Sequence, residues 1–262
     1  MVMMLAGVRP VVRQVDHIVV QSDDPKQLFD LLTGTLRLPV AHPFRNESGE
    51  ISAGVGAGNI SIELFRPADA PRTERPRARF TGLALEPYQQ LSQILSELQA
   101  AGIVCDPPQS YASTLPDGSR GTFWTTVVLP QLSVPGLSVF LSEYNRAFLN
   151  VEVRRKQWGG ELTLSKGGPL GFESVKEIIV GTGNLEGDRE IWQKLLPQPG
   201  EGPAMRLTKS ATEGIQRIVF KVKSLEQAKD YLKAQHWLGV VSQADVGIAA
   251  SAVQGLSIRL TN

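Results

Sequence analysis

Few side chains in this chain could do chemistry, and the most informative is a histidine inside an apolar segment. The 262 residues include three histidines, at positions 17, 42 and 236. His17 interrupts the run Val15–Val20, which otherwise has the composition of a buried strand. An imidazole in this setting suggests a metal ligand, a proton acceptor or a hydrogen-bonded structural group. The elements around it decide among these alternatives.

Two other kinds of reactive centre have no support in the sequence. Cys105 is the single cysteine, which excludes an intramolecular disulfide and a zinc site built from several cysteines. Ser110, Ser113 and Ser142 have no histidine in a triad-like context, so nucleophilic hydrolysis is not indicated.

Four segments share one design, a short β-rich strand followed by an amphipathic helix. They begin at Val15, Phe80, Val175 and Ile215. In the helices apolar residues recur every three or four positions, as at Leu91, Ile94, Leu95 and Leu98. The stretch Ser22-Asp23-Asp24 followed by Pro25 fits a helix cap with proline at the first helical position.

Further strands complete the repeat. Glu50–Gly56 is expected to pair with Asn59–Phe65 across a glycine turn, and Ser110–Ser113 with Thr122–Leu129. The unit is therefore a strand, a helix and up to three antiparallel strands. The third unit has room for only one extra strand, from Ala204. We expect a domain of two units at residues 13–146, a linker at 147–173 and a reduced domain at 174–262.

This βαβββ repeat resembles the vicinal oxygen chelate superfamily, which includes glyoxalases, bleomycin-resistance proteins and extradiol dioxygenases. VDHIVVQSDDP is similar to the opening strand of that fold, and GNISIELFRP is similar to its fourth strand. The resemblance implies an α+β fold in which repeated βαβββ modules form open, curved mixed sheets, in a tandem arrangement with a truncated C-terminal half.

The resemblance also implies a metal site. In this fold a divalent ion is held by residues of the first and fourth strands of each module, on the face that lines a cavity. His17 and Glu63 stand at these positions in the first module. Imidazole and carboxylate ligands with open positions suit iron, manganese, nickel or zinc.

The second module departs from this pattern. Gly82 stands where a ligand is expected, and glycine cannot coordinate through a side chain. At the fourth-strand position one alignment gives Phe140 and another gives Glu143. If the second alignment holds, Glu143 would complete the metal site or act as a base. No further histidine lies on these strands, so an extradiol dioxygenase or complete glyoxalase centre is poorly supported.

Two functions remain. The first is a metal-dependent lyase or isomerase that acts on a small oxygenated substrate, with Phe123, Trp124 and Phe140 as an apolar wall and His42 reaching into the pocket. The second is a metal-free protein that sequesters a small molecule. In that case, a buried His17–Glu63 pair is a structural hydrogen bond.

The C-terminal half has other residues at the corresponding positions. Glu177 and Arg217 match His17, and Arg259 matches Glu63. Guanidinium has no free acceptor and cannot hold a cation. Structural ion pairs are favoured over an anion site there.

Composition argues against several partners. The formal net charge is +1, so no overall field attracts nucleic acid or an anionic membrane. No window has the apolar length of a membrane span, and the N-terminus has no signal-peptide pattern, so a cytoplasmic protein is expected. The GVGAGN stretch from Gly54 lies between two strands and is expected to be a hairpin turn. An exposed sheet edge would allow a homodimer.

Overall fold

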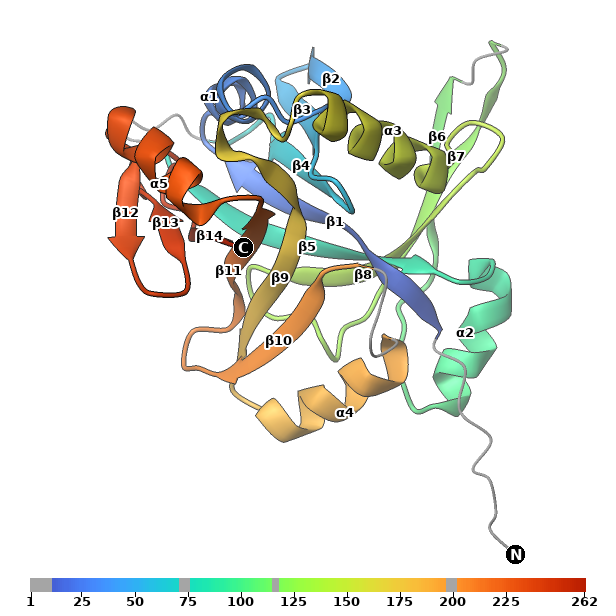
Figure 1. Cartoon of the computed structure of the whole chain (residues 1–262). Helices are drawn as coiled ribbons and strands as arrows, with labels where there is room; N and C mark the ends of the chain where they lie inside the picture. The colour runs from blue at the N-terminus through green and yellow to red at the C-terminus, as the bar shows by residue number, and fades with distance from the viewer. Residues whose placement is uncertain (1–10, 71–75, 115–117, 197–201) are drawn as a thin grey trace, which may run out of the picture.

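Two open, curved sheets form the protein in this computed structural model, which describes residues 11–70, 76–114, 118–196 and 202–262. Among these residues one sheet has eight strands in the order β2-β3-β4-β1-β5-β8-β7-β6, and the other has six in the order β10-β9-β11-β14-β13-β12 (Figure 1). The α+β fold of repeated βαβββ modules is confirmed.

The first sheet contains two complete modules, each built from a strand, a helix and three further strands. Their elements are β1 (Val12–Ser22), α1 (Pro25–Phe29) with a π-helical turn (Asp30–Thr35), β2 (Val40–Glu47), β3 (Glu50–Gly56), β4 (Ser61–Arg66), β5 (Ala78–Pro87), α2 (Leu91–Ala100), β6 (Gln109–Thr114), β7 (Arg120–Val128) and β8 (Ser138–Tyr144). The two first strands, β1 and β5, pair antiparallel at the centre, and each pairs in parallel with its own fourth strand, β4 or β8. The predicted helix cap is present, because the Asp24 side chain accepts from the Gln27 amide.

The second sheet repeats the plan with one truncated module. Its elements are β9 (Phe172–Thr182), α4 (Leu185–Leu195), β10 (Ala204–Lys209), β11 (Gly214–Val222), α5 (Leu225–Ala234), β12 (Leu238–Val241), β13 (Val246–Ile248) and β14 (Ile258–Thr261). β10 pairs in parallel with β9 as β4 does with β1, so it takes the place of a fourth strand. Second and third strands are missing from this module among the described residues.

Each of the four first strands carries a β-bulge at the same place. The pairing registers leave one extra residue at Asp16, Thr81, Lys176 and Gln216. Each lies immediately before a position expected to hold a ligand, so the bulges confirm that Gly82, Glu177 and Arg217 correspond to His17. A bulge breaks the alternation of side chains along a strand. Asp16 and His17 can therefore face the same side of the sheet.

A helix covers the concave face of the first sheet. It is α3 (Val151–Leu164), and it lies within the segment 147–173 that we expected to be a linker. A Cβ atom on Gly56 would stand 2.7 Å from Cγ of Trp158, so the indole packs directly on the backbone of β3. Arg154 donates a hydrogen bond to the Ala41 carbonyl of β2. The helix therefore occupies the inside of the curved sheet (Figure 1).

The two halves share one apolar core. Its buried residues come from both sheets and from α2, α4 and α5. Gln254, only 5% exposed, accepts from the Ser22 hydroxyl at 2.6 Å and donates to the Asp24 carbonyl at 2.8 Å. These contacts tie the loop before β14 to the end of β1.

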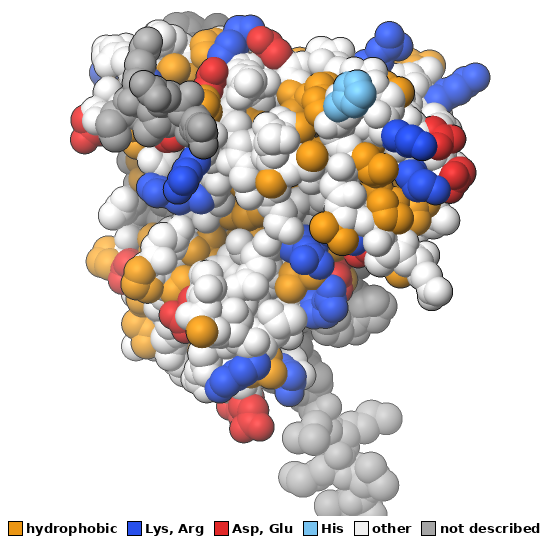
Figure 2. Space-filling view, turned by 90° about the vertical axis from the view of Figure 1, so that its left-hand side faces the viewer, with side chains coloured by type: hydrophobic (Ala, Val, Ile, Leu, Met, Phe, Trp, Pro, Cys, Tyr) orange, Lys and Arg blue, Asp and Glu red, His pale blue; other side chains and the backbone are white. Residues whose placement is uncertain are grey.

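The outer surface shows no large field of one sign on the side viewed in Figure 2. Acidic, basic and apolar side chains alternate over that face, as the net charge of +1 would suggest. None of the described helices has the length and apolar character needed to cross a membrane.

The close contact at Gly56 predicts how α3 contributes to stability. Gly56→Ala should lower the free energy of unfolding by about 1–3 kcal/mol, because the added methyl group forces Trp158 away. Gly160→Ala is the matched control: it lies in α3 with open space around it, and alanine should raise helix stability by up to about 1 kcal/mol. Urea unfolding measures the free energy of unfolding of both variants. A wild-type value for Gly56→Ala would contradict this packing.

Candidate functional site

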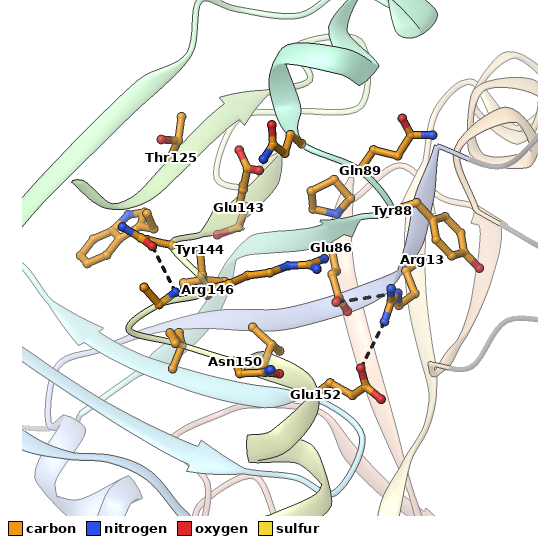
Figure 3. Close-up of a pocket in the computed structure, with 18 of the residues that line it drawn as sticks. Arg13, Glu86, Tyr88, Gln89, Thr125, Glu143, Tyr144, Arg146, Asn150 and Glu152 are labelled. Carbon is orange, nitrogen blue, oxygen red and sulfur yellow. Dashed lines mark hydrogen bonds and ion pairs between the residues drawn. The ribbon is translucent and has the colours of Figure 1, made fainter. Parts of the chain in front are cut away.

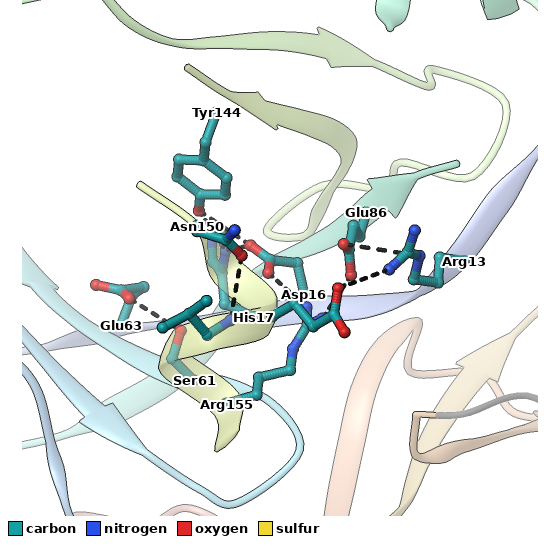
Figure 4. A network of polar contacts seen from close by, with 11 residues as sticks. Arg13, Asp16, His17, Ser61, Glu63, Glu86, Tyr144, Asn150 and Arg155 are labelled. Carbon is teal, nitrogen blue, oxygen red and sulfur yellow. Dashed lines mark hydrogen bonds and ion pairs between the residues drawn. The ribbon is translucent and has the colours of Figure 1, made fainter. Parts of the chain in front are cut away.

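The site lies between the concave face of the first sheet and α3. His17 on β1 is in register with Ser61 on the neighbouring parallel strand β4, and Val19 is in register with Glu63. His17 and Glu63 therefore face the same side of the sheet and are offset by two residues in the register (Figure 4).

The side chain of His17 is hydrogen-bonded to that of the preceding residue, Asp16. Its Nδ1 atom stands 2.8 Å from Asp16 Oδ2, and the imidazole is 8% exposed. Burial alone would lower the pKa of His17, but the hydrogen bond and the charge of Asp16 outweigh it and raise that pKa. The phenol of Tyr144 donates to the same Asp16 oxygen at 2.9 Å. Burial and the nearby Asp16 carboxylate raise the pKa of Tyr144 well above its usual value.

An arginine of α3 completes this cluster. Arg155 Nη2 lies 2.9 Å from Asp16 Oδ1, and Arg155 Nη1 lies 2.6 Å from Glu86 Oε2 on β5. Burial opposes ionisation of Asp16, but the hydrogen bond from His17 and the charges of His17 and Arg155 keep its pKa below the usual value. Glu86 also faces Arg13 at 3.9 Å.

Glu63 has partners of its own. Its Oε2 atom lies 2.5 Å from His42 Nε2, and its Oε1 atom accepts from the Ser61 hydroxyl at 3.1 Å. Burial would raise the pKa of Glu63, but the His42 hydrogen bond lowers it, and the same bond raises the pKa of His42 against its own burial. His42 reaches inward across Gly54, where a Cβ atom would stand 2.4 Å from its ring.

The second module offers no donors to this cluster. Phe140 on β8 is in register with Ala84, just as Glu63 is with Val19, so Phe140 occupies the fourth-strand position. Its ring meets the His17 ring edge-on, with centroids 5.7 Å apart. A Cβ on Gly82 would lie within 3.3 Å of Phe140 and 2.8 Å of Val19, so those side chains fill the space of a ligand.

Glu143 is separated from His17 and Glu63. It alternates with Phe140, Ser142 and Tyr144 along β8 and faces the opposite side of the strand. Its Oε2 atom accepts from the Leu91 amide at 3.3 Å, at the start of α2. Here Glu143 partners a free amide of a helix N-terminus, a position that favours a carboxylate.

A divalent ion is consistent with this fold, but the side chains as arranged do not fit one. His17 Nδ1 and both oxygens of Glu63 already have protein partners, and Arg155 adds a positive charge beside Asp16. Catalytic metal sites normally supply three protein ligands. No group of three His, Cys, Asp or Glu side chains that could hold a metal ion occurs in the part of the chain that the structure describes.

A polar cavity opens beside the cluster. It has a volume of about 720 Å³ and lies among the end of β8, the start of α2 and the start of α3 (Figure 3). Tyr144, Glu86 and Arg13 belong both to its wall and to the cluster. Three carboxylates, two guanidinium groups and several amides line it; the carboxylates are Glu86, Glu143 and Glu152, and the amides include Gln89, Gln90, Gln93, Asn145 and Asn150.

The expected pocket residues divide between the cavity and the cluster. Trp124 lines the cavity, and Phe123 packs against it edge-on at 5.6 Å. His42 and Phe140 instead contact Glu63 and His17. Of the aromatic wall expected from the sequence, only Trp124 lines the cavity.

Sequence reasoning missed Asp16, Tyr144 and Arg155. Asp16 adjoins His17, and strict alternation would place the two on opposite faces, so the bulge hides their contact. Arg155 lies in a basic run without amphipathic periodicity. The sequence did hold one signal: Asp16 and Glu86 are acidic residues on strands expected to be buried. Buried carboxylates need a cation as partner.

Ion pairs stand at the corresponding positions of the second half. Glu177 pairs with Arg206, which occupies the fourth-strand position of β10, at 2.8 Å. Arg259 pairs with Asp245, and Arg217 donates to the Ser257 hydroxyl at 3.2 Å. The structural ion pairs favoured from the sequence are present.

Comparison with known proteins gives a fold but no sequence relative. No protein-family model matches the chain, and no curated protein sequence does. A variant of homoprotocatechuate 2,3-dioxygenase from B. fuscum superposes with a TM-score of 0.63 at 10% identity, over 97% of this chain and 72% of that one. The 2,3-dioxygenase LapB from Pseudomonas sp. KL28 superposes with a TM-score of 0.63 at 12% identity, over 96% of this chain and 92% of that one. The resemblance in fold is confirmed.

The raised pKa values of His17 and His42 predict a pH dependence of stability. A raised pKa stabilises the folded state fully below the unfolded value of about 6.5, and this contribution is lost as pH rises through the folded value. His17→Gln should make the free energy of unfolding fall less steeply with rising pH, by at most about 1.4 kcal/mol per pH unit. Urea unfolding between pH 5.5 and 9 measures it, and identical slopes would refute the coupling.

The buried ion pair of Arg155 predicts an asymmetric effect of mutation. Arg155→Met should cost about 3 kcal/mol at pH 7, because it removes the guanidinium partner of the buried Asp16 carboxylate. Adding Asp16→Asn should restore part of that loss. Arg206→Met breaks a pair in which Arg206 is 54% exposed and should cost under about 1 kcal/mol. Equal losses in both single variants would contradict a structural role for the Arg155 pair.

Proposed function

From the vicinal oxygen chelate fold of this chain, we propose that the protein binds a small polar, oxygenated molecule in the cavity between β8, α2 and α3, without a metal at His17. The observation that carries the proposal is the contrast between two neighbouring places. Nδ1 of His17 and both oxygens of Glu63 are engaged by protein groups under α3, whereas the cavity beside them is lined by many polar side chains, several of them exposed.

The cavity walls define the class of ligand. Its volume of about 720 Å³ is within the range of small-molecule sites. Arginines, carboxylates and side-chain amides provide both donors and acceptors, and Tyr88 and Trp124 add aromatic surface. This combination suits a neutral or zwitterionic molecule with several hydroxyl, carbonyl or amide groups better than an apolar one.

A second candidate is a metal-dependent enzyme, either a ring-cleaving oxygenase like the proteins it superposes on or a lyase or isomerase. Two observations favour it: the structural likeness to dioxygenases, and the pairing of His42 with Glu63 on the same face of the sheet as His17. These are the donor types of non-haem iron sites. Binding an ion would require these side chains to exchange their present partners for it.

We also propose that residues 13–146 and 174–262 are the two structural units of the protein, joined by the segment 147–173. An exposed edge of either sheet could pair two copies in a homodimer.

Elemental analysis separates the two candidate functions. Untagged protein purified without chelator should contain far less than one equivalent of iron, manganese, nickel or zinc, and Glu63→Ala should not change the content. About one equivalent in the wild type that disappears in Glu63→Ala would replace the binding proposal with the metal-dependent one.

Ligand-observed NMR tests the cavity directly. A panel of polyols, amino acids, 2-oxo acids and catechols should give at least one compound that contacts the protein. Its signal should disappear in Thr122→Trp, which fills the cavity, and persist in Ser113→Trp, on the neighbouring strand outside it. Binding that survives Thr122→Trp would place the ligand elsewhere and reject the proposed site.

A further inference from the structure

A second groove lies beyond the C-terminal end of α3, where three segments distant in sequence meet. It has a volume of about 580 Å³. Its lining comes from the turn after the first helix, the connection after α3, and α5 with the residue before it: Thr35, Arg37, Ser165, Lys166, Gly168, Pro169, Lys223, Gln227 and Tyr231. The connection from α3 to β9 passes between α1 and α5 at this place (Figure 1). Neither His17 nor the cavity beside it takes part.

Direct contacts fix the three segments relative to one another. A Cβ atom on Gly168 would stand 2.4 Å from the Leu36 carbonyl oxygen, so only glycine allows this approach. The Gln227 side-chain amide donates to the Pro169 carbonyl at 3.3 Å, and the Lys223 amide donates to the Gly171 carbonyl at 2.8 Å. The walls of the groove are therefore held in place before any ligand arrives.

The groove is positively charged. Arg37, Lys166 and Lys223 line it, and its described lining contains no aspartate or glutamate. In the part of the chain that the structure describes, none of the three cations has a carboxylate within 4.0 Å, whereas Arg155, Arg206 and several other basic residues are paired. Exposed cations that line one groove without a counter-charge repel one another, and a bound anion would relieve that repulsion.

Two of these cations stand where their residue type is unfavourable. Arg37 and Lys166 have φ values of 60° and 53°, in the left-handed region, each at the position that follows the end of a helix. Glycine is the usual residue at such a position. Non-glycine residues in this conformation tend to occur at functional sites. A basic side chain at both positions suggests that the charge is useful there.

We propose that this groove binds an oxyanion with two or more charges, either a phosphate-bearing or a polycarboxylate small molecule. Arg37, Lys166 and Lys223 supply the charge. The hydroxyls of Thr35 and Tyr231 are further donors on the same walls, whereas the Ser165 hydroxyl donates to the Leu162 carbonyl at 3.2 Å. The groove is separate from the cavity beside Tyr144, so the proposal holds whether or not that cavity binds a ligand.

Calorimetric titration with pyrophosphate and with citrate, at low ionic strength, tests the proposal. At least one should bind with a stoichiometry near one and weaken as sodium chloride is added. Tighter pyrophosphate binding identifies a phosphate ligand, and tighter citrate binding identifies a polycarboxylate. Each of Arg37→Gln, Lys166→Gln and Lys223→Gln should weaken binding about tenfold, since each removes one close charge.

Two kinds of control make the result decisive. Lys229→Gln removes a cation that is paired with Glu226 on α5 outside the groove, and it should leave binding unchanged. Arg37→Gly and Lys166→Gly should raise the thermal midpoint, because glycine relieves the backbone strain, and should still weaken binding. Lack of saturable binding of both probes, or wild-type affinity in the triple Arg37→Gln, Lys166→Gln, Lys223→Gln variant, would overturn the proposal.

Discussion

The buried contact between Arg155 and Asp16 holds together the parts of the molecule on which function depends. It joins α3 to the central strand of the first sheet, and through Glu86 it reaches the neighbouring strand as well. Charges so far from water are tolerated only when paired and hydrogen-bonded, and here His17 and Tyr144 provide the additional bonds to Asp16. The position of α3 then determines which surface is covered and which stays open as a cavity.

Four copies of one structural position show how a repeated fold diverges. The first and fourth strands carry His17 and Glu63 in the first module, Gly82 and Phe140 in the second, Glu177 and Arg206 in the third, and Arg217 and Arg259 in the fourth. The bulge before this position is kept in all four modules, while the side chains change from donors to packing groups and ion pairs. Backbone geometry is thus separable from the chemistry placed on it, as is general for widely used folds.

The sequence was sufficient to predict the fold because that depends on repeated local patterns. The strand–helix repeats, the glycine turn at Gly56–Gly58 and the single extra strand from Ala204 follow from periodicity and turn residues, which act locally. The contacts of the site depend on features that no local pattern displays. The bulge at Asp16 turns two neighbours to one face. The apolar stripe of α3 is short, limited to Trp158 and Leu162 among its buried residues, because Arg154 and Arg155 occupy the rest of its inner face. Only the strand register could decide whether Phe140 or Glu143 occupies the fourth-strand position of the second module.

The contacts of Gln254 explain why a half with few donors of its own is useful to the chain. This side chain lies deep between the halves and bonds the end of β1, close to the capped start of α1. With a core that continues from one sheet to the other, the second half acts as a mechanical support: it keeps β1 in position, and β1 carries Asp16 and His17. Because buried residues of both halves belong to one core, a large-to-small substitution in the second half would also weaken the packing around β1.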